Sequence, residues 1–547
     1  MMRTTETKNG VSVKAYAGTT GVLLGMNIEP RMRDGLLGFA LERLDGRSDK
    51  KEWLNGAVAF PGTQREDGGL LPTNQAPIQR FRWSDYRVFD DTEYEYTVHP
   101  VYGKPANPEV EDGPTVAVKT AGLSGEHAVL FNRAAAASQA FSRKFPEVEK
   151  ELEAARKAKK DPPPLPQGAL DWLNRGILKQ IIGFVEQATD ATWALDIAIY
   201  EYELKDIVDA VNAAHRRGVN VRVVYHAKKK DKQTEENERS LSALPDEAKT
   251  ARLTHKICHH KFVVLSKLEG GVRRPRAVLC GSTNFTHNGV YRQANVVHVV
   301  RRADVAQQYL TLFEELFEGA DVRATRRFIN QNNPLGPSQP LFAGFSPRSG
   351  LADLQAFIRE VEAAKGDVLF CTAFDLYDDL EAALLGEPLD PILRYGVQNS
   401  RSKITGFHRD RTADFVATSM LSRGLEGFLK ESTKGQRGNI LIHTKLIVVD
   451  FTSDTPVVIS GSHNLSKSAS EGNDENFLMV RENTDVADCY GCELMRLYDH
   501  YRFRWYRKQG TDREPPSLAE DDSWTEEYFE PGSLKESDRL RFAGQAV

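Results

Sequence analysis

The chain contains 547 residues, of which 40% are hydrophobic and 27% are charged, and its formal net charge is −5. This length predicts two or three domains, the composition is that of an ordinary globular protein, and the mild acidity excludes a strong overall attraction to nucleic acid or anionic membranes. No apolar run approaches the roughly 20 residues that a transmembrane helix needs, and the first residues lack the apolar segment of a signal peptide. Five cysteines, an odd number, favour reduced thiols. We therefore expect a cytoplasmic protein with no transmembrane segment.

Residues 1–130 are rich in Gly, Pro and short β-prone runs. Phe81–Val88 and Tyr94–Val98 alternate between polar and apolar side chains, as half-buried strands do. We expect a β-rich accessory domain here, with a fibronectin-like sandwich as the candidate architecture. Such domains bind partners or pack against a catalytic body more often than they catalyse, so this one could bind an unknown partner.

The sequence changes character after residue 130. A charged helix, Glu147–Lys160, is followed by a Pro-rich stretch that ends it. We expect four further parts. A helical and Pro-rich linker covers residues 131–167, two α/β halves of one catalytic body cover residues 168–335 and 336–515, and a C-terminal tail covers residues 516–547.

Both halves begin with alternating helix and strand patterns, which predict parallel strands joined by helices. In the first half, the periodicity predicts a helix, a strand, a helix and a strand over Ala169–Gln187, Leu195–Tyr200, Leu204–Arg217 and Val219–Tyr225. In the second half, the same order is predicted over Leu351–Lys365, Asp367–Thr372, Tyr377–Leu385 and Ile392–Val397.

Two insertions are charged. Lys228–Arg239 predicts a mobile loop. Asn399–Lys434 could wall a substrate pocket and meet a head group or a nucleic-acid backbone with its basic residues, which are Arg401, Lys403, His408 and Arg409.

The segment Ile442–Asp450 carries the pattern H-x-K-x-x-x-x-D in a run of mostly apolar, β-branched residues, which predicts a buried strand. Strand side chains alternate between two faces, so His443 and Lys445 lie side by side on one face. This pair suits a bound phosphate, because Lys neutralises it and His can attack it or move its proton. A G-S-x-N turn, Gly461–Asn464, follows the strand.

A second copy of this pattern lies upstream. His259 and Lys261 are followed by the turn Gly281–Asn284. The two motif histidines are 184 residues apart, and the first glycines of the two turns are 180 residues apart. Two such pairs at nearly one offset indicate an internal duplication.

These paired motifs resemble the phospholipase D superfamily over residues 168–510. The resemblance implies two similar α/β halves packed face to face around one site. One His would form a covalent phosphohistidine, the other would protonate the leaving alcohol, and no metal or other cofactor would be needed. The catalytic residues that the resemblance implies are His259, Lys261, Asn284, His443, Lys445 and Asn464, supported by Ser282, Asp450, Ser462 and Glu475.

The first half departs from the family pattern at two positions. Ser266 stands where the motif has Asp, and Ala294 aligns with Glu475. Carboxylates beside a histidine set its pKa. The sequence therefore predicts that Glu475 supports His443 as the cationic acid and leaves His259 as the nucleophile, which agrees with the family's usual assignment.

Three hypotheses about function follow, and the first two share a phosphodiester substrate. The first is hydrolysis or transfer of a phosphatidyl group, because two motifs in one chain fit the family's lipid-acting members. The second is a nuclease or nucleotidyl phosphodiesterase acting on DNA or RNA, which the cytoplasmic placement and the basic insertion favour. The third is a catalytically weakened binding protein, motivated by Ser266 and Ala294.

Overall fold

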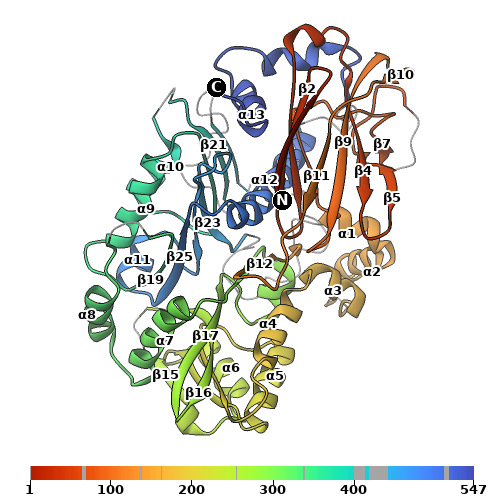
Figure 1. Cartoon of the computed structure of the whole chain (residues 1–547). Helices are drawn as coiled ribbons and strands as arrows, with labels where there is room; N and C mark the ends of the chain where they lie inside the picture. The colour runs from red at the N-terminus through yellow and green to blue at the C-terminus, as the bar shows by residue number, and fades with distance from the viewer. Residues whose placement is uncertain are drawn as a thin grey trace.

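The computed structural model describes residues 2–63, 69–134, 138–161, 163–253, 256–336, 339–387, 390–398, 413–417, 442–509 and 517–547. Within these residues, a β-rich N-terminal region adjoins a mixed α/β body (Figure 1). This is the fold class that the sequence predicts. The basic residues predicted to wall a pocket, 401–409, lie outside the described residues.

The N-terminal region consists of antiparallel strands in two main sheets. One sheet has the order β1 (Arg3–Lys8), β2 (Val11–Ala17), β3 (Val22–Ile28) and β8 (Arg82–Asp85). The other has the order β10 (Asn107–Val110), β9 (Glu93–Lys104), β4 (Gly38–Asp45) and β5 (Lys50–Trp53), with β11 (Thr115–Lys119) also paired to β9, while β6 (Asn55–Gly56) and β7 (Leu71–Pro72) form a separate pair. Alternate side chains from both main sheets, such as Leu24 and Tyr96, share one buried cluster, as in a sandwich.

The first half of the body is built on a seven-stranded sheet. Its order is β12 (His127–Phe131), β18 (Val296–Val300), β17 (Val272–Gly281), β16 (Lys261–Glu269), β13 (Trp193–Ile199), β14 (Asn220–Ala227) and β15 (Lys249–Leu253). Strand β12, at the predicted end of the accessory domain, is the antiparallel edge strand of this sheet.

A second seven-stranded sheet has the same pattern of connections. Its order is β19 (Leu341–Ser346), β25 (Glu475–Arg481), β24 (Val457–Gly461), β23 (Lys445–Val449), β20 (Asp367–Thr372), β21 (Leu393–Gln398) and β22 (Ala413–Ala417). In each sheet three strands are parallel and the other pairings are antiparallel. The sheets are therefore mixed, because hairpins return the chain after the helix-linked strands. A single apolar cluster runs through both sheets.

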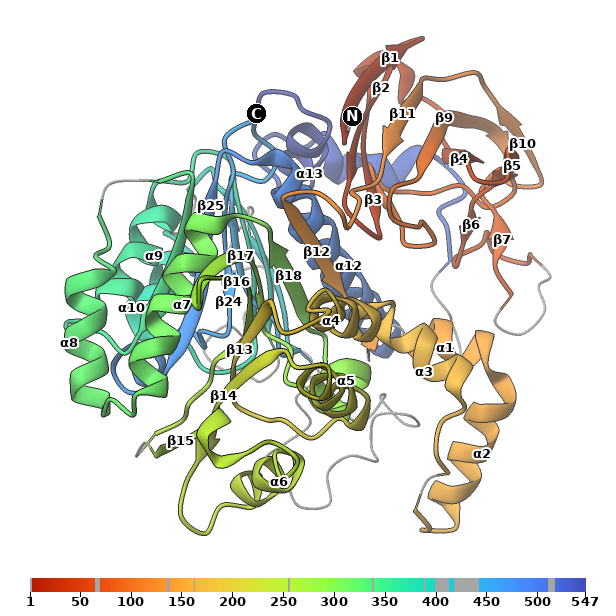
Figure 2. The same cartoon turned by 60° about the horizontal axis from the view of Figure 1, so that its bottom comes forward.

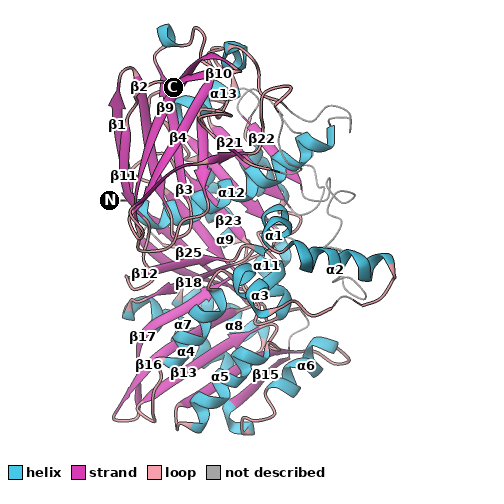
Figure 3. Ribbon diagram, turned by 90° about the vertical axis from the view of Figure 1, so that its right-hand side faces the viewer, coloured by secondary structure: helices cyan, strands magenta, loops and turns pink. Residues whose placement is uncertain are grey.

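Helices pack against both sheets, and α2 projects from the body (Figures 2 and 3). Those of the linker and first half are α1 (Ser138–Lys144), α2 (Pro146–Lys157), α3 (Gln167–Asn174), α4 (Ile177–Glu186), α5 (Lys205–Arg216), α6 (Lys232–Ser240), α7 (Ala303–Phe317) and α8 (Val322–Asn332). The remaining ones are α9 (Ala352–Glu362), α10 (Asp378–Leu385), α11 (Lys467–Glu471), α12 (Thr484–Gln509) and α13 (Leu534–Phe542). Among the described residues, no helix combines the length and apolarity needed to cross a bilayer.

Two local predictions are wrong. The single helix predicted over residues 169–187 is two helices, because Arg175 and Gly176 both adopt positive φ angles, 51° and 94°, and end the first helix. The loop predicted over residues 228–239 is largely helix α6, capped by the Asp231 side chain, which accepts a hydrogen bond from the Thr234 backbone N–H. The charge run at this position is the solvated face of a capped helix.

Helix α12 and the C-terminal segment join the N-terminal strands to the second half (Figure 2). Arg82 of β8 pairs with Asp499 of α12 at 3.0 Å and with Asp538 of α13 at 3.1 Å. The Tyr395 hydroxyl of β21 donates to the same Asp538 carboxylate. The predicted tail therefore packs between the β-rich region and the second sheet.

Replacing Arg82 tests this junction. Because Arg82 is 8% exposed and its removal leaves two carboxylates without their partner, we expect Arg82→Met to lower the free energy of unfolding by about 3 kcal/mol. Chemical denaturation measures this loss. Arg80→Met is the matched control, since Arg80 lies 3.9 Å from Asp499 with a side chain 46% exposed and should cost less than about 1 kcal/mol. Equal losses in the two variants would contradict the proposed role of Arg82.

Candidate functional site

The two predicted His-Lys pairs meet where the two sheets face each other. Strands β16 and β23 begin at Lys261 and Lys445, so each histidine lies just before its strand and not within it. Parallel bridges between Cys258 and Asp474 and between Ala294 and Ile442 join the two halves beside these histidines. Segments 184 residues apart in sequence are thereby brought into one site.

The two histidine rings face each other across the interface. The ring centroids of His259 and His443 are 6.1 Å apart at an interplanar angle of 74°. Burial, with the nearby charges of Lys261 and Lys445, lowers the pKa of both imidazoles well below the usual value. In the substrate-free protein, these shifts favour the neutral form of both rings.

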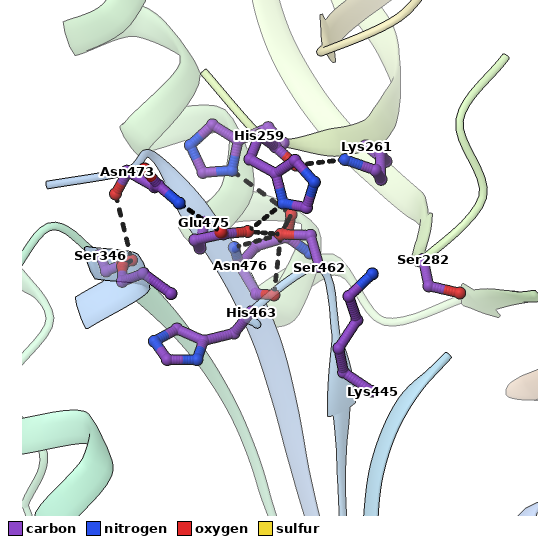
Figure 4. A network of polar contacts seen from close by, with 12 residues as sticks. His259, Lys261, Ser282, Ser346, Lys445, Ser462, His463, Asn473, Glu475 and Asn476 are labelled. Carbon is purple, nitrogen blue, oxygen red and sulfur yellow. Dashed lines mark hydrogen bonds and ion pairs between the residues drawn. The ribbon is translucent and has the colours of Figure 1, made fainter. Parts of the chain in front are cut away.

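Each ring is oriented by a residue from the opposite half. Glu475 at the start of β25 accepts a hydrogen bond from His259 Nδ1 at 2.7 Å and one from the Ser462 hydroxyl at 2.7 Å (Figure 4). The Asn473 side chain donates to the second carboxylate oxygen at 3.1 Å. Because Nδ1 of His259 carries the proton in this contact, its Nε2 atom has a lone pair available to substrate.

His443 has a different environment. Its Nδ1 lies 3.1 Å from the Ser282 carbonyl oxygen and 3.1 Å from Asn295 Oδ1. The Ser282 hydroxyl donates to Asn295 Oδ1 at 2.8 Å, as the Ser462 hydroxyl does to Glu475. His443 is therefore oriented by neutral acceptors.

These contacts correct two predictions. Glu475 supports His259 and not His443, because its side chain reaches across the interface. The counterpart of Glu475 in the first half is Asn295 and not Ala294, since Ala294 bridges to Ile442 as Asp474 bridges to Cys258. The first half thus keeps an oriented polar side chain but lacks its negative charge.

The lysines and asparagines line the same interface. Lys261 Nζ donates to the His259 carbonyl at 2.7 Å, and Lys445 Nζ donates to the His443 carbonyl at 2.5 Å. Burial lowers the pKa of Lys261 to about 8, and burial together with the neighbouring Lys261 lowers that of Lys445 well below its usual value. The side-chain oxygens of Asn284 and Asn464 are buried without a hydrogen-bond partner among the described residues. Buried polar groups without partners are typical of a ligand site.

The glycines of the two turns are required by close backbone approach. A Cβ atom on Gly281 would lie 2.2 Å from the Val296 carbonyl oxygen, and one on Gly461 would lie 2.3 Å from that of Asn476. Only glycine fits where two strands approach this closely. The G-S-x-N pattern thereby places each serine and asparagine directly beside the neighbouring strand.

Asp450 supports the second half away from the histidines. It accepts hydrogen bonds from the backbone N–H groups of Lys365 and Gly366 at 2.9 and 2.6 Å, where α9 leads into β20. Its counterpart Ser266 is buried, and its hydroxyl has no partner among the described residues. Losing this Asp changes a turn support and does not remove a group from the interface.

Three residues at the site were not predicted from the sequence. The Glu201 carboxylate accepts a hydrogen bond from Asn284 Nδ2 at 2.5 Å. The Tyr200 ring lies 5.2 Å from the His259 ring and the Phe374 ring lies 6.3 Å from the His443 ring, between centroids. All three follow the first parallel strand of their half, β13 or β20. This place at the carboxyl end of a parallel strand is the signal that could have found them.

Other histidines near the motifs have structural contacts. His463 lies 3.1 Å from Asp353 through Nε2, and its Nδ1 accepts from the Leu465 backbone N–H at 3.0 Å. His260 Nδ1 lies 3.3 Å from Asn476 Oδ1. Among the described residues, no group of three or more His, Cys, Asp or Glu is arranged to hold a metal ion.

The fold and the site define an α/β protein with one composite histidine–lysine site between two sheets of the same strand order. Residues 184–317 match the family model described as "Cardiolipin synthase, PLD-like domain". Over these residues the chain is thus similar to a phospholipase-D-like domain, in agreement with the family resemblance of the paired motifs. A comparison with curated proteins gives no match.

Several solved structures are similar. Polyphosphate kinase from Porphyromonas gingivalis is 13% identical over 64% of this chain and 52% of its own, with a TM-score of 0.40. Phosphatidylserine synthase from Haemophilus influenzae Rd KW20 is 13% identical over 60% of this chain and 84% of its own, with a TM-score of 0.41. The phospholipase D family member Nuc from Salmonella typhimurium is 18% identical over 25% of this chain and 84% of its own, with a TM-score of 0.21. This chain therefore spans about half of the polyphosphate kinase.

The turn-supporting role of Asp450 predicts a loss of stability. Asp450→Ala leaves the N–H groups of Lys365 and Gly366 without their acceptor, so we expect the free energy of unfolding to fall by about 1–3 kcal/mol. Chemical denaturation tests this. Ser266→Ala, at the counterpart position, should stay within about 0.5 kcal/mol of wild type, because it removes a hydroxyl that has no partner among the described residues. An unchanged stability of Asp450→Ala would contradict this role.

Proposed function

We propose that the protein is a metal-independent phosphodiesterase of the phospholipase D type, which hydrolyses or transfers a phosphatidyl group through a phosphohistidine intermediate. The observation that carries this proposal is the facing pair of histidines, 6.1 Å apart between ring centroids, with both Nδ1 atoms engaged by acceptors. This separation accommodates one phosphorus atom with its attacking and leaving atoms on opposite sides.

The reaction then has two steps. His443 takes up a proton when the negatively charged phosphodiester binds beside it, because the anion favours the imidazolium. In the first step, His259 Nε2 attacks phosphorus, the bond from phosphorus to the leaving oxygen breaks, and protonated His443 gives its proton to that oxygen. In the second, neutral His443 takes a proton from water or an alcohol, whose oxygen attacks phosphorus and releases His259. Lys261, Lys445 and the amide groups of Asn284 and Asn464 hold the non-bridging oxygens as negative charge builds on them.

The two orienting residues support this division of roles. Glu475 stabilises the positive charge that His259 acquires when it becomes phosphorylated. The Ser282 carbonyl and the Asn295 amide orient His443 without adding a negative charge, so its imidazolium gives up a proton readily. The assignment of His259 as nucleophile thus rests on a different contact from the one that the sequence indicated.

A phosphatidyl substrate is supported by two observations. The matching family model is described by the name of cardiolipin synthase. The exposed Phe374 ring, 36% accessible beside His443, adds an apolar surface at the leaving-group side. The aromatic faces of Tyr200 and Phe374 also suit base stacking, so a nuclease is the alternative.

The third hypothesis, a weakened binding protein, has less support, because the motif residues of both halves converge in one interface. We also propose a cytoplasmic location, since all five cysteines are buried free thiols.

The first test is hydrolysis of bis(p-nitrophenyl) phosphate in the presence of a chelator. We expect turnover by the wild type and losses of at least about 10³-fold in kcat for both His259→Ala and His443→Ala, because each removes one of the two proton- or phosphoryl-transfer groups. Vesicles with labelled phosphatidyl lipids and labelled single-stranded DNA then separate the lipid from the nucleic-acid hypothesis. No turnover of any of these substrates would contradict the phosphodiesterase proposal.

A second test concerns the roles of the histidines. Asn295→Asp places a negative charge 3.1 Å from His443 Nδ1, which favours the imidazolium and raises its pKa. The alkaline limb of the kcat/KM profile should therefore move upward by about one pH unit or more. Glu475→Gln should lower kcat without this upward movement. The Asn295 variant also loses the bond from Nδ2 to the Gly289 carbonyl, so its folding is checked by thermal unfolding. An unmoved alkaline limb in a folded Asn295→Asp protein would contradict the role of His443 as acid.

A further inference from the structure

Glu201 is held in place beside the first G-S-x-N turn. Its backbone carbonyl accepts from the Phe285 N–H at 3.0 Å, and the Phe285 carbonyl accepts from the Glu203 N–H at 3.0 Å. Phe285 directly follows Asn284. These backbone contacts fix the distance between Glu201 and the asparagine of the site.

Helix α6 holds the same segment from the other side. The buried Asn237 side chain accepts from the Tyr202 N–H at 2.9 Å and donates to the Tyr200 carbonyl at 2.9 Å. The segment that carries Glu201 is therefore fixed at three consecutive residues, as a built part of the site and not a loose loop.

The Glu201 side chain contacts a residue of the proposed phosphate site. Its carboxylate accepts from Asn284 Nδ2, a donor that the proposed reaction assigns to substrate. The charges of Lys261 and Lys445 both act on this carboxylate, while burial, helped by Glu203, raises the pKa of Glu201 to about 7. The carboxylate is thus influenced by the same three residues that the proposed reaction assigns to the phosphate oxygens.

At the matching position of the second half stands an aromatic residue and not a carboxylate. Cys371 of β20 pairs with Leu446, as Ala198 of β13 pairs with Phe262, so Cys371 and Ala198 are matching positions. Three residues after Cys371 is Phe374, and three residues after Ala198 is Glu201. The two sides of the site therefore differ in charge at matching positions.

We propose that Glu201 is a specificity residue, which favours phosphodiesters with one negative charge over phosphomonoesters and other dianions at the oxygen-binding position formed by Asn284, Lys261 and Lys445. This inference rests on the proposed function, because it concerns the same phosphate site.

Electrostatics supports this role. The positive charges of Lys261 and Lys445 attract a dianion more strongly than a diester, so a doubly charged product or inhibitor would stay bound. An ionised carboxylate a few ångströms away opposes the second negative charge more than it opposes a single one. The discrimination should appear as pH rises through about 7, because Glu201 is neutral below its pKa and charged above it.

Sulfate binding tests the inference directly, because this ion stays doubly charged across the range used. We expect Glu201→Gln to bind sulfate at least about tenfold more tightly than wild type at about pH 8, with the ratio falling toward one at about pH 6. Glutamine keeps an acceptor for Asn284, so a role limited to orienting that amide would leave sulfate binding unchanged. Isothermal titration calorimetry measures both affinities without requiring turnover.

Two variants complete the experiment. Glu203→Gln, two residues away, should bind sulfate as the wild type does, which controls for a change in net charge. In the Glu201→Gln background, Lys445→Met should weaken sulfate binding at least about tenfold, which places the ion at this site.

Equal sulfate affinities of wild type and Glu201→Gln at about pH 8, or binding by neither, would overturn the inference, as would binding that is insensitive to Lys445. Failure of the phosphodiesterase assay with the expected sulfate result would instead count against the proposed reaction alone.

Discussion

The reciprocal contact between the two halves is the constraint on which the site depends. Glu475 of the second half orients His259 of the first at 2.7 Å, and Asn295 of the first orients His443 of the second at 3.1 Å. Backbone bridges beside both histidines fix the register of this contact. Neither half by itself has both histidines with the residues that orient them. The shared strand order matters for the site because it brings matching strand ends of the two sheets together. The buried Arg252–Asp474 pair at 2.8 Å, next to one of the bridges, adds an ionic contact to the same junction.

Differences between the two halves give the two histidines different roles in the proposed reaction. Identical surroundings would give both rings the same proton affinity, yet the proposed reaction needs one lone pair and one proton at the same time. Two replacements at matching positions provide the difference. Asn295 stands opposite Glu475 and keeps the hydrogen bond while removing the charge. Phe374 stands opposite Glu201 and replaces a carboxylate by an apolar ring. At each of these two pairs of matching positions, one residue is a carboxylate and the other is uncharged.

Local patterns in the sequence predicted much of the fold and the site because they act over a few residues. The strand Asp367–Thr372 has the predicted bounds, and the H-x-K and G-S-x-N patterns lie at strand ends as short-range rules require. The contact between Glu475 and His259 could not be predicted, because the two residues are 216 positions apart and motif spacing gives no information about such distant contacts. In the sequence, Asn295 was aligned with Asn476 because both are asparagines. The strand register decides which side chains face the site, and it makes Asn295 the counterpart of Glu475, one residue away from that alignment. Glu201 was missed because its role depends on a turn more than 80 residues later, which meets it only in the folded sheet.

The β-rich region and the C-terminal segment support the same site through helix α12. This helix contacts β2 on one side and strands β20 to β24 of the second sheet on the other. Gly18 fits against it because a Cβ atom there would lie 2.9 Å from the Asp488 carbonyl oxygen, and Arg3 forms an ion pair with the Asp488 side chain at 2.6 Å. Since β23 carries Lys445 at its first position and packs on α12, the N-terminal strands back the sheet that positions half of the site. An accessory region of this kind contributes to the chemistry through rigidity, because a lysine and a histidine held to within a fraction of an ångström depend on the layers behind them.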